Sequence, residues 1–383
     1  MTPRALTSNA DDRKRKKSKE GDLESSSFSF CERLSELRKS LSADALLVSL
    51  PANILYLCGF SGSAGLLLVE PTRSTLFTDS RYTFQSRQEV KEARIVIAKK
   101  GLLSAAADRL SARRGRITLA ASFKHLTVAQ RDALAARLGK RVRWTDDNAA
   151  VERLRAVKSP PELAIMKDAA VLISRVFQKI VPRIRPGVTE LEVAARIEYE
   201  IKLLGGSGPS FETIVAAGPR SSWAHARPSS KPLAKNELVV LDHGAILRAY
   251  CSDLTRTVYV GRAPSRIRGL YAAVLEAQQA AKAAIKPGIT AGAVDAAARS
   301  TLKRRRLAKY FTHSTGHGLG LEIHEMPRIG RGEEAVLQEG MVVTVEPGVY
   351  LDGIGGIRIE DDVVVTKAGA VDLTTAPRDF LEL

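Results

Sequence analysis

Cysteine, aromatic residues and long apolar runs are all scarce in this 383-residue sequence. Its three cysteines, Cys31, Cys58 and Cys251, form an odd set without short paired spacings. They therefore exclude a disulfide framework and a zinc-finger cluster, and they favour a reducing compartment. No apolar stretch approaches the roughly 18 residues that a membrane span requires. We expect a soluble protein that does not span a membrane.

The N-terminal region also lacks an apolar segment behind its basic run at 13–17, so we expect no secretory signal and a cytoplasmic location. Acidic residues are outnumbered by basic ones, which gives a formal net charge of +17. The excess is scattered, however, and neither a nucleic-acid module nor interleaved aromatic residues accompany it. We therefore do not expect a nucleic-acid partner, and we interpret residues 1–27 as a disordered basic tail.

The length favours two domains, because single hydrophobic cores stop growing well before this size. Four β-rich runs alternate with helical patterns in the first part, at 43–50, 64–69, 74–78 and 94–97. That alternation is typical of an α/β domain. A charged linker with a Pro-Pro pair follows, so the sequence predicts domains at 28–150 and 151–383.

A helix start follows this linker. Ser159, two prolines and Glu162 form a capping-box pattern. Apolar residues then recur at helical spacing, at Leu163, Met166, Ala170, Ile173 and Phe177. The pattern predicts an amphipathic helix that packs against a sheet.

The second part contains an internal repeat. Arg-Pro-Gly-Val-Thr at 185–189 precedes one helical pattern, and Lys-Pro-Gly-Ile-Thr at 286–290 precedes another. Each copy continues into a glycine-rich stretch and a predicted hairpin that bears two acidic residues. These are Asp242 and Asp253 in the first copy and Glu346 and Glu360 in the second. The matched positions predict an α+β domain with pseudo-twofold symmetry, in which the four carboxylates converge.

The four carboxylates lie at the ends or in the middle of apolar strand patterns. Asp242 ends the run 238–241, and Glu346 ends the run 341–345. A single carboxylate at a strand end is ordinary. Four that converge cannot all remain buried and unpaired, because each desolvated charge costs several kcal/mol. Metal ions are the natural compensation.

Three of the six histidines, His313, His317 and His324, fall within one glycine-rich stretch. Glycine allows close backbone approach, and histidine is a common ligand and acid–base group. Four carboxylates and one imidazole would suit Mn²⁺, Co²⁺, Fe²⁺ or Zn²⁺ better than a thiolate-binding ion. Two such ions with bridging carboxylates activate water as a nucleophile. The sequence thus predicts a metal-dependent hydrolase.

At these residues the chain closely resembles the Xaa-Pro aminopeptidase and prolidase family of pita-bread metallopeptidases. The resemblance covers most of the chain from about residue 29, and the family's five ligand segments occur in order, at 241–245, 252–257, 315–320, 346–350 and 358–361. The segments 56–63 and 79–82 are similar to the creatinase-type N-terminal domain of these enzymes. The resemblance implies a creatinase-like α/β domain followed by an α+β pita-bread catalytic domain.

The resemblance also implies a role for each matching residue. Two divalent ions, Mn²⁺ first and Co²⁺, Zn²⁺ or Fe²⁺ as alternatives, would be held by Asp242, Asp253, His317, Glu346 and Glu360. Glu346 would also accept a proton from water, and His225 and His324 would contact the scissile carbonyl and the tetrahedral intermediate. The residues that bind substrate or support the proline pocket would be His225, His313, Tyr350 and Arg358.

The implied activity is that of an Xaa-Pro aminopeptidase, with proline-containing peptides as substrates and a homodimer as the assembly. An Xaa-Pro dipeptidase, or prolidase, uses the same metal chemistry and stays open as an alternative. A metal-free pita-bread protein that binds peptides is the non-enzymatic alternative, although such proteins lose ligands that are all present here. Methionine aminopeptidases lack the N-terminal domain and creatinase lacks the metal ligands, so both are disfavoured.

Overall fold

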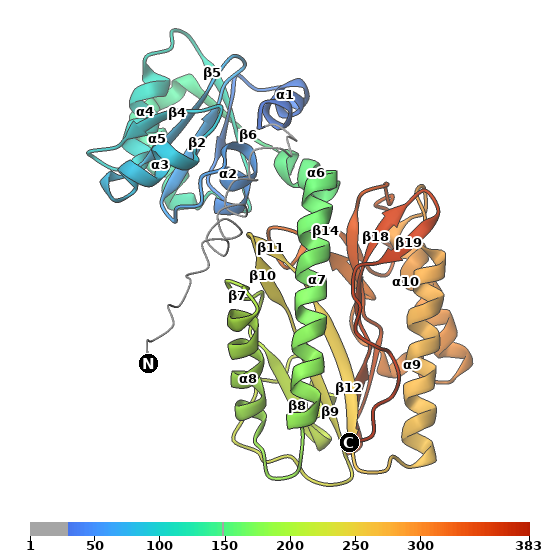
Figure 1. Cartoon of the computed structure of the whole chain (residues 1–383). Helices are drawn as coiled ribbons and strands as arrows, with labels where there is room; N and C mark the ends of the chain where they lie inside the picture. Colours follow the sequence, from blue (N-terminus) through green and yellow to red (C-terminus); the bar gives the residue numbers. More distant parts are fainter. Residues whose placement is uncertain (1–29, 148) are drawn as a thin grey trace, which may run out of the picture.

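The structure is a computed structural model that describes residues 30–147 and 149–383. Its first part is built on a mixed six-stranded sheet with the strand order β4-β3-β2-β1-β5-β6 (Figure 1). The strands are β1 (Ala45–Val48), β2 (Gly65–Val69), β3 (Ser74–Thr78), β4 (Arg94–Ile97), β5 (Ile117–Ala121) and β6 (Val142–Asp146). The helices are α1 (Phe30–Ser40), α2 (Pro51–Cys58), α3 (Thr83–Glu89), α4 (Leu102–Ser111) and α5 (Val128–Leu138).

The four strands predicted from the sequence are confirmed as β1 to β4, and β5 and β6 were not singled out. β1 runs parallel to β5 and antiparallel to β2 in the middle of the sheet, and all four of its residues are buried. Such a buried strand reads as a continuous apolar run. β6 alternates partly exposed and charged residues at the sheet edge, which makes its pattern weak. The predicted basic tail, residues 1–27, lies outside the described residues.

A short helix, α6 (Ala150–Ala156), connects this sheet to the long helix α7 (Pro160–Ile180). The predicted start of α7 is confirmed: the Glu162 carboxylate accepts hydrogen bonds from the backbone N–H of Ser159 at 2.9 Å and from its hydroxyl at 2.6 Å. The predicted apolar stripe packs inward, and Ile173 and Phe177 join the core under the strands of the second part.

The repeat is confirmed as two helix pairs, α7 with α8 (Glu190–Leu203) and α9 (Ser265–Ala284) with α10 (Ala291–Arg304). The turns before α8 and α10 are alike in detail. Gly187 and Gly288 adopt positive φ angles of 90° and 86°, a conformation that favours glycine. Their N–H groups donate to Leu233 and Leu337, in both cases at 2.9 Å.

The strands repeat in the same way. In the first copy β9 pairs antiparallel with β12, and the small hairpin β10–β11 is inserted between them; in the second, β15 pairs with β18 around the hairpin β16–β17. The strands of the first copy are β7 (Gly208–Pro209), β8 (Ile214–Ala217), β9 (Glu237–His243), β10 (Ala245–Leu247), β11 (Tyr250–Cys251) and β12 (Leu254–Val260). Those of the second are β13 (Gly316–Gly318), β14 (Glu325–Ile329), β15 (Val342–Val345), β16 (Gly348–Leu351), β17 (Gly355–Arg358), β18 (Asp361–Thr366) and β19 (Gly369–Asp372).

The strands of the two copies lie between the two helix pairs, with α7 and α8 on one side and α9 and α10 on the other (Figure 1). Each copy therefore buries one sheet face against its own helices. The two copies meet along β12 and the β17–β18 segment, where the backbone N–H of Glu360 donates to the carbonyl of Thr255 at 3.2 Å. Asp253 and Glu360 lie beside this contact. Among the described residues, no helix is long and apolar enough to cross a membrane.

Candidate metal centre

The five predicted ligand residues line one cavity of about 380 Å³. Asp242 lies near the end of β9, Asp253 directly before β12, His317 in β13, Glu346 directly after β15 and Glu360 directly before β18. Ligand atoms of Asp253, His317 and Glu360 lie within 4.8 Å of one another. Glu346 joins this group through His317, whose Nε2 lies 3.5 Å from Glu346 Oε1. Asp242 lines the same cavity but points one oxygen, Oδ2, at Arg358.

The backbone around His317 is held too tightly for any residue but glycine beside it. A Cβ on Gly316 would lie 2.0 Å from the carbonyl oxygen of Thr344, and one on Gly318 would lie 2.2 Å from that of Met326. Nδ1 of His317 bonds to the Gly318 carbonyl at 3.0 Å. That bond leaves Nε2 as the nitrogen that faces the carboxylates, which is the usual arrangement of a ligand histidine.

The carboxylates in this cavity lack compensation by protein cations. Among the described residues, Arg358 is the one permanently charged side chain that forms an ion pair with any of the four, and it pairs with Asp242. One oxygen each of Asp242, Asp253 and Glu360 is buried without a hydrogen-bond partner. Buried, unpartnered carboxylate oxygens are unfavourable unless a cation meets them.

The pKa values of these residues reflect the same shortage of protein cations around the carboxylates. Burial and the neighbouring carboxylates Glu360 and Asp242 raise the pKa of Asp253 well above its usual value, and burial and Glu346 do the same for Glu360. Burial raises the pKa of Glu346 to about 8 despite the nearby Arg358. Burial lowers the pKa of His317 to about 4, so its imidazole is neutral and able to bind a metal. The donor set fits hard or borderline divalent cations.

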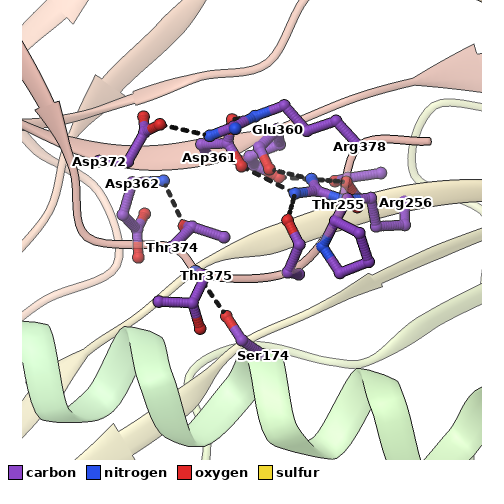
Figure 2. A network of polar contacts seen from close by, with 12 residues as sticks. Ser174, Thr255, Arg256, Glu360, Asp361, Asp362, Asp372, Thr374, Thr375 and Arg378 are labelled. Atoms are coloured by element: carbon purple, nitrogen blue, oxygen red, sulfur yellow. Dashed lines mark hydrogen bonds and ion pairs between the residues drawn. The ribbon is translucent and has the colours of Figure 1, made fainter.

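Asp361, which follows Glu360 and is the first residue of β18, has the opposite environment. The Asp361 carboxylate accepts hydrogen bonds from Arg256 Nη2 at 2.8 Å and from Arg378 Nε at 2.5 Å (Figure 2). Gln278 donates to it as well. Although burial opposes it, Arg256 and Arg378 lower the pKa of Asp361. Arg256 also donates to the backbone carbonyl of Glu360 at 2.6 Å. This arginine therefore fixes the backbone from which the Glu360 carboxylate projects into the cavity.

Other supporting groups were not recognised in the sequence. The hydroxyl of Thr255 donates to Glu360 at 2.5 Å, and that of Thr344 donates to Glu346 at 3.3 Å. Asp362 accepts the backbone N–H of Asp253 at 2.9 Å. The threonines stand two residues after Asp253 and two residues before Glu346, at positions that are not equivalent in the repeat, so the sequence carried no distinctive signal for them.

The other predicted histidines surround the cavity mouth. His225, in the loop after the helical turn Gly218–Ser222, and His324, directly before β14, are both exposed and line the cavity. The rings of His317 and His324 lie 4.4 Å apart at 75°. His324 thus sits beside the candidate ligand with its ring open to the cavity.

Glu325, the neighbour of His324, is anchored to the connection between the two parts of the chain. Its carboxylate pairs with Arg155 of α6 at 2.5 Å and with Lys158 at 3.3 Å. Arg155 also donates to Asn53 of α2 at 2.6 Å. The loop that presents His324 is therefore tied to the first sheet domain.

His313, Tyr350 and Arg358 form one chain of contacts. His313 Nε2 lies 2.9 Å from the Tyr350 hydroxyl, and Arg358 Nη1 donates to that hydroxyl at 2.6 Å. The other end of Arg358 binds Asp242. Arg358 is buried with its donors engaged, so the structure places it behind a candidate ligand. His313 lines an adjoining cavity of about 410 Å³, which shares Asp242, His317 and Glu346 with the first cavity, and the two together form the candidate active-site cleft.

Arg328 is a further cavity residue that the sequence did not single out. It projects from β14 beside His313 and Ser314, and its side chain is 67% exposed. An alternating strand with one arginine carries no distinctive motif. Its position beside His313 and Ser314 follows from the pairing of β13 with β14.

Comparison with known proteins gives two family matches. The family described as Metallopeptidase family M24 matches residues 164–367, and the Creatinase/Prolidase N-terminal domain matches residues 31–157. Both lie where the structure has its two sheet assemblies.

Individual relatives match over nearly the whole chain. An Xaa-Pro dipeptidase of Pyrococcus furiosus is 36% identical over 354 residues, which is 91% of this chain and 99% of the relative. The structure of an Xaa-Pro dipeptidase from Bacillus anthracis superposes with a TM-score of 0.89 at 35% identity, covering 92% of this chain and all of that one. An X-Pro aminopeptidase from Thermotoga maritima gives 0.84 at 34% identity, covering 91% and 99%.

Proposed function

Because the chain belongs to metallopeptidase family M24, a family of metal-dependent peptidases, we propose that it hydrolyses the bond between an N-terminal residue and a following proline. The observation that carries the proposal is the cluster of four carboxylates and His317 around one cavity, in which buried oxygens lack protein partners. The names of the relatives supply the substrate class.

We propose that the cluster holds two divalent ions, with Mn²⁺ first among Mn²⁺, Co²⁺, Zn²⁺ and Fe²⁺. The residues that would hold them are Asp242, Asp253, His317, Glu346 and Glu360. When bound, such ions lower the pKa of water and polarise a carbonyl. Oxygen ligands with one imidazole suit these ions, and the raised pKa values of Asp253 and Glu360 indicate how strongly the cavity favours an added positive charge.

The chain's own residues then have distinct tasks. Glu346 accepts a proton from the attacking water, because its carboxylate lines the cavity, 3.5 Å from the His317 Nε2 atom that faces the other candidate ligands. His225 and His324 donate to the oxygen on which negative charge develops. Arg358 holds Asp242 and the Tyr350 hydroxyl in place, which also orients His313 at the wall of the cavity.

Two activities share this chemistry. Arg328, an exposed cation at the cavity wall, supports a dipeptidase, because it can meet the C-terminal carboxylate of an Xaa-Pro dipeptide. The dipeptidase names among the relatives support it as well. The sequence favoured the aminopeptidase, and one observation supports that activity: the cavity continues past Arg328 into further space.

The test is hydrolysis of Ala-Pro and of Ala-Pro-Ala by the purified protein with Mn²⁺ supplied. We expect cleavage of the bond before proline, and no cleavage of Ala-Ala. An Arg328→Gln variant should lose efficiency on the dipeptide more than on the tripeptide if Arg328 binds the carboxylate that follows proline. Failure to cleave either peptide, together with failure to retain metal, would instead favour the metal-free peptide-binding alternative.

The remaining proposals rest on the resemblance and on the family. We propose domain limits at 28–150 and 151–383, a homodimer and a cytoplasmic location. Analytical ultracentrifugation would test the dimer, and limited proteolysis around residues 147–160 would test the boundary.

A further inference from the structure

A second cavity adjoins the candidate active-site cleft on the side of His313. It has a volume of about 380 Å³. It shares His313, Ser314 and Arg328 with the cavity of about 410 Å³ that contains the candidate ligands His317 and Glu346. A substrate that extends beyond His313 therefore enters this second cavity.

The lining of the second cavity is strongly basic. It consists of residues from α10, from the helical turn Ala308–Tyr310, from the segment before β13 and from β14 and the turn after it. None of its nine lining residues is acidic. Its cationic side chains are Arg299, Lys309, Arg328 and Arg331.

These four cations differ in how far they are already engaged. Arg299 pairs with Asp295 at 2.6 Å and donates to the carbonyl of Phe311 at 3.0 Å, so it serves the fold. Within residues 30–147 and 149–383, no carboxylate lies within ion-pair distance, 4.0 Å, of Lys309 or Arg331. Both are exposed. Lys309 Nζ lies 4.9 Å from the centroid of the Tyr310 ring, a contact that leaves its charge open to a ligand.

Arg328 stands between the two cavities. Its nearest carboxylate is Glu333, at 3.9 Å from Nη1, and its Nε lies 3.3 Å from the Ser314 hydroxyl. Arg328 lines both cavities, and it is the cation proposed above to meet the carboxylate that ends an Xaa-Pro dipeptide. A residue that follows proline would therefore continue past Arg328 into the basic cavity.

We propose that this second cavity is a substrate subsite for a carboxylate on the residue that follows proline, recognised by Lys309 and Arg331. The carboxylate comes either from an acidic side chain or from the C-terminus of a tripeptide. This inference rests on the proposed function and names the substrate class within it: short Xaa-Pro peptides with a negative charge one residue beyond proline. Exposed ion pairs are weak, so each cation contributes about a two- to fivefold preference.

The experiment compares kcat/KM for Ala-Pro-Glu, Ala-Pro-Gln and Ala-Pro-Gln-amide, with Ala-Pro as the reference, in the metal-loaded enzyme. The variants are Lys309→Gln, Arg331→Gln and the two combined. Matched controls are Arg183→Gln and Lys235→Gln, because both residues are exposed cations outside the lining of either cavity. The measurements are repeated at low and high salt.

We expect the wild type to prefer Ala-Pro-Glu over Ala-Pro-Gln if the side chain supplies the charge, and Ala-Pro-Gln over its amide if the C-terminus does. The combined variant should remove most of either preference, as should high salt, while the control variants retain it. Equal rates on all three tripeptides, or a preference unchanged in the combined variant, would overturn the subsite. So would cleavage of Ala-Pro alone, a result that leaves the proposed function intact. Cleavage of no substrate would overturn both.

Discussion

Glu360 and Asp361 are neighbours in the chain, both buried, and yet their surroundings are opposite. Asp361 points to two arginines (Figure 2), and a lysine lies nearby. Glu360 lies near other carboxylates and has one oxygen without a partner. The pKa of Asp361 is lowered, and that of Glu360 is raised well above its usual value. The protein therefore provides cations for Asp361, whose role is to support the fold, and among the described residues it provides none for Glu360.

This contrast explains why the surroundings of Glu360 indicate metal binding. A buried carboxylate can be stabilised by a fixed arginine, by a proton or by a metal ion. At Asp361 the arginine is built in. At Asp253 and Glu360 none is, and their raised pKa values mean that protons and a divalent ion compete for the same oxygens.

The largest effect should come from removing the charge of a candidate metal ligand. Asp253→Asn removes a candidate ligand, so we expect activity to fall by more than about 100-fold and metal content to fall with it. Because Asp253 is uncompensated, the melting temperature of the metal-free protein should stay the same or rise. A variant that retains full metal content would contradict the assignment.

The matching substitution at Asp361, which pairs with arginines, should lower the stability of the fold instead. Asp361→Asn leaves the buried Arg256 without its carboxylate and removes one of the two carboxylates that Arg378 contacts, which should lower the free energy of unfolding by about 3–5 kcal/mol. Urea denaturation with and without Mn²⁺ measures this loss. The comparison fails if Asp361→Asn is no less stable than wild type in the metal-free state.

A smaller difference should separate two histidines whose rings touch. His317→Ala should weaken metal binding, and excess Mn²⁺ should partly restore its activity. His324→Ala should keep its metal yet lose roughly 10²–10³-fold in turnover, the usual scale for one donor to a developing oxyanion. Metal analysis of both proteins decides: equal loss of metal from the two would mean that the roles were assigned wrongly.

The smallest effect concerns pH. The pKa of Glu346 is raised in the fold, to about 8, so this group contributes stability that is fully present below its ordinary value of 4.5 and is lost as the pH rises through about 8. Metal-free protein should therefore lose thermal stability between about pH 5 and 8 relative to a Glu346→Gln variant. Added Mn²⁺ should stabilise the wild type more at pH 8 than at pH 5. A Mn²⁺ effect that is equal at both pH values would contradict this.

Much of this arrangement could be predicted from residue patterns. The repeat could be recognised from two Pro-Gly turns, because the positive φ angles at Gly187 and Gly288 favour glycine at equivalent places in the two copies. The ligand residues could be named because charged residues in apolar strands are rare. Lys309, Arg328 and Arg331 could not be identified in this way, because exposed cations look alike in a sequence with a net charge of +17. They become a group only when the helical turn Ala308–Tyr310 lies beside β14 and the turn after it.

Asp361 shows a second limit of the sequence. It stands beside Glu360 in an uninterrupted acidic run, and nothing in the run tells which residue faces the cavity. Alternation along β18 sends the neighbours to opposite sides, and the partner of each side comes from distant segments such as Arg256 and Arg378.

The central claim is that the carboxylates around His317 hold metal ions that make the protein a peptidase. The most direct test measures bound metal and Ala-Pro hydrolysis in the same chelator-treated sample while Mn²⁺ is added back. We predict no hydrolysis without metal, and activity that rises with occupancy to two ions per chain. Full hydrolysis in a demonstrably metal-free sample would contradict the account.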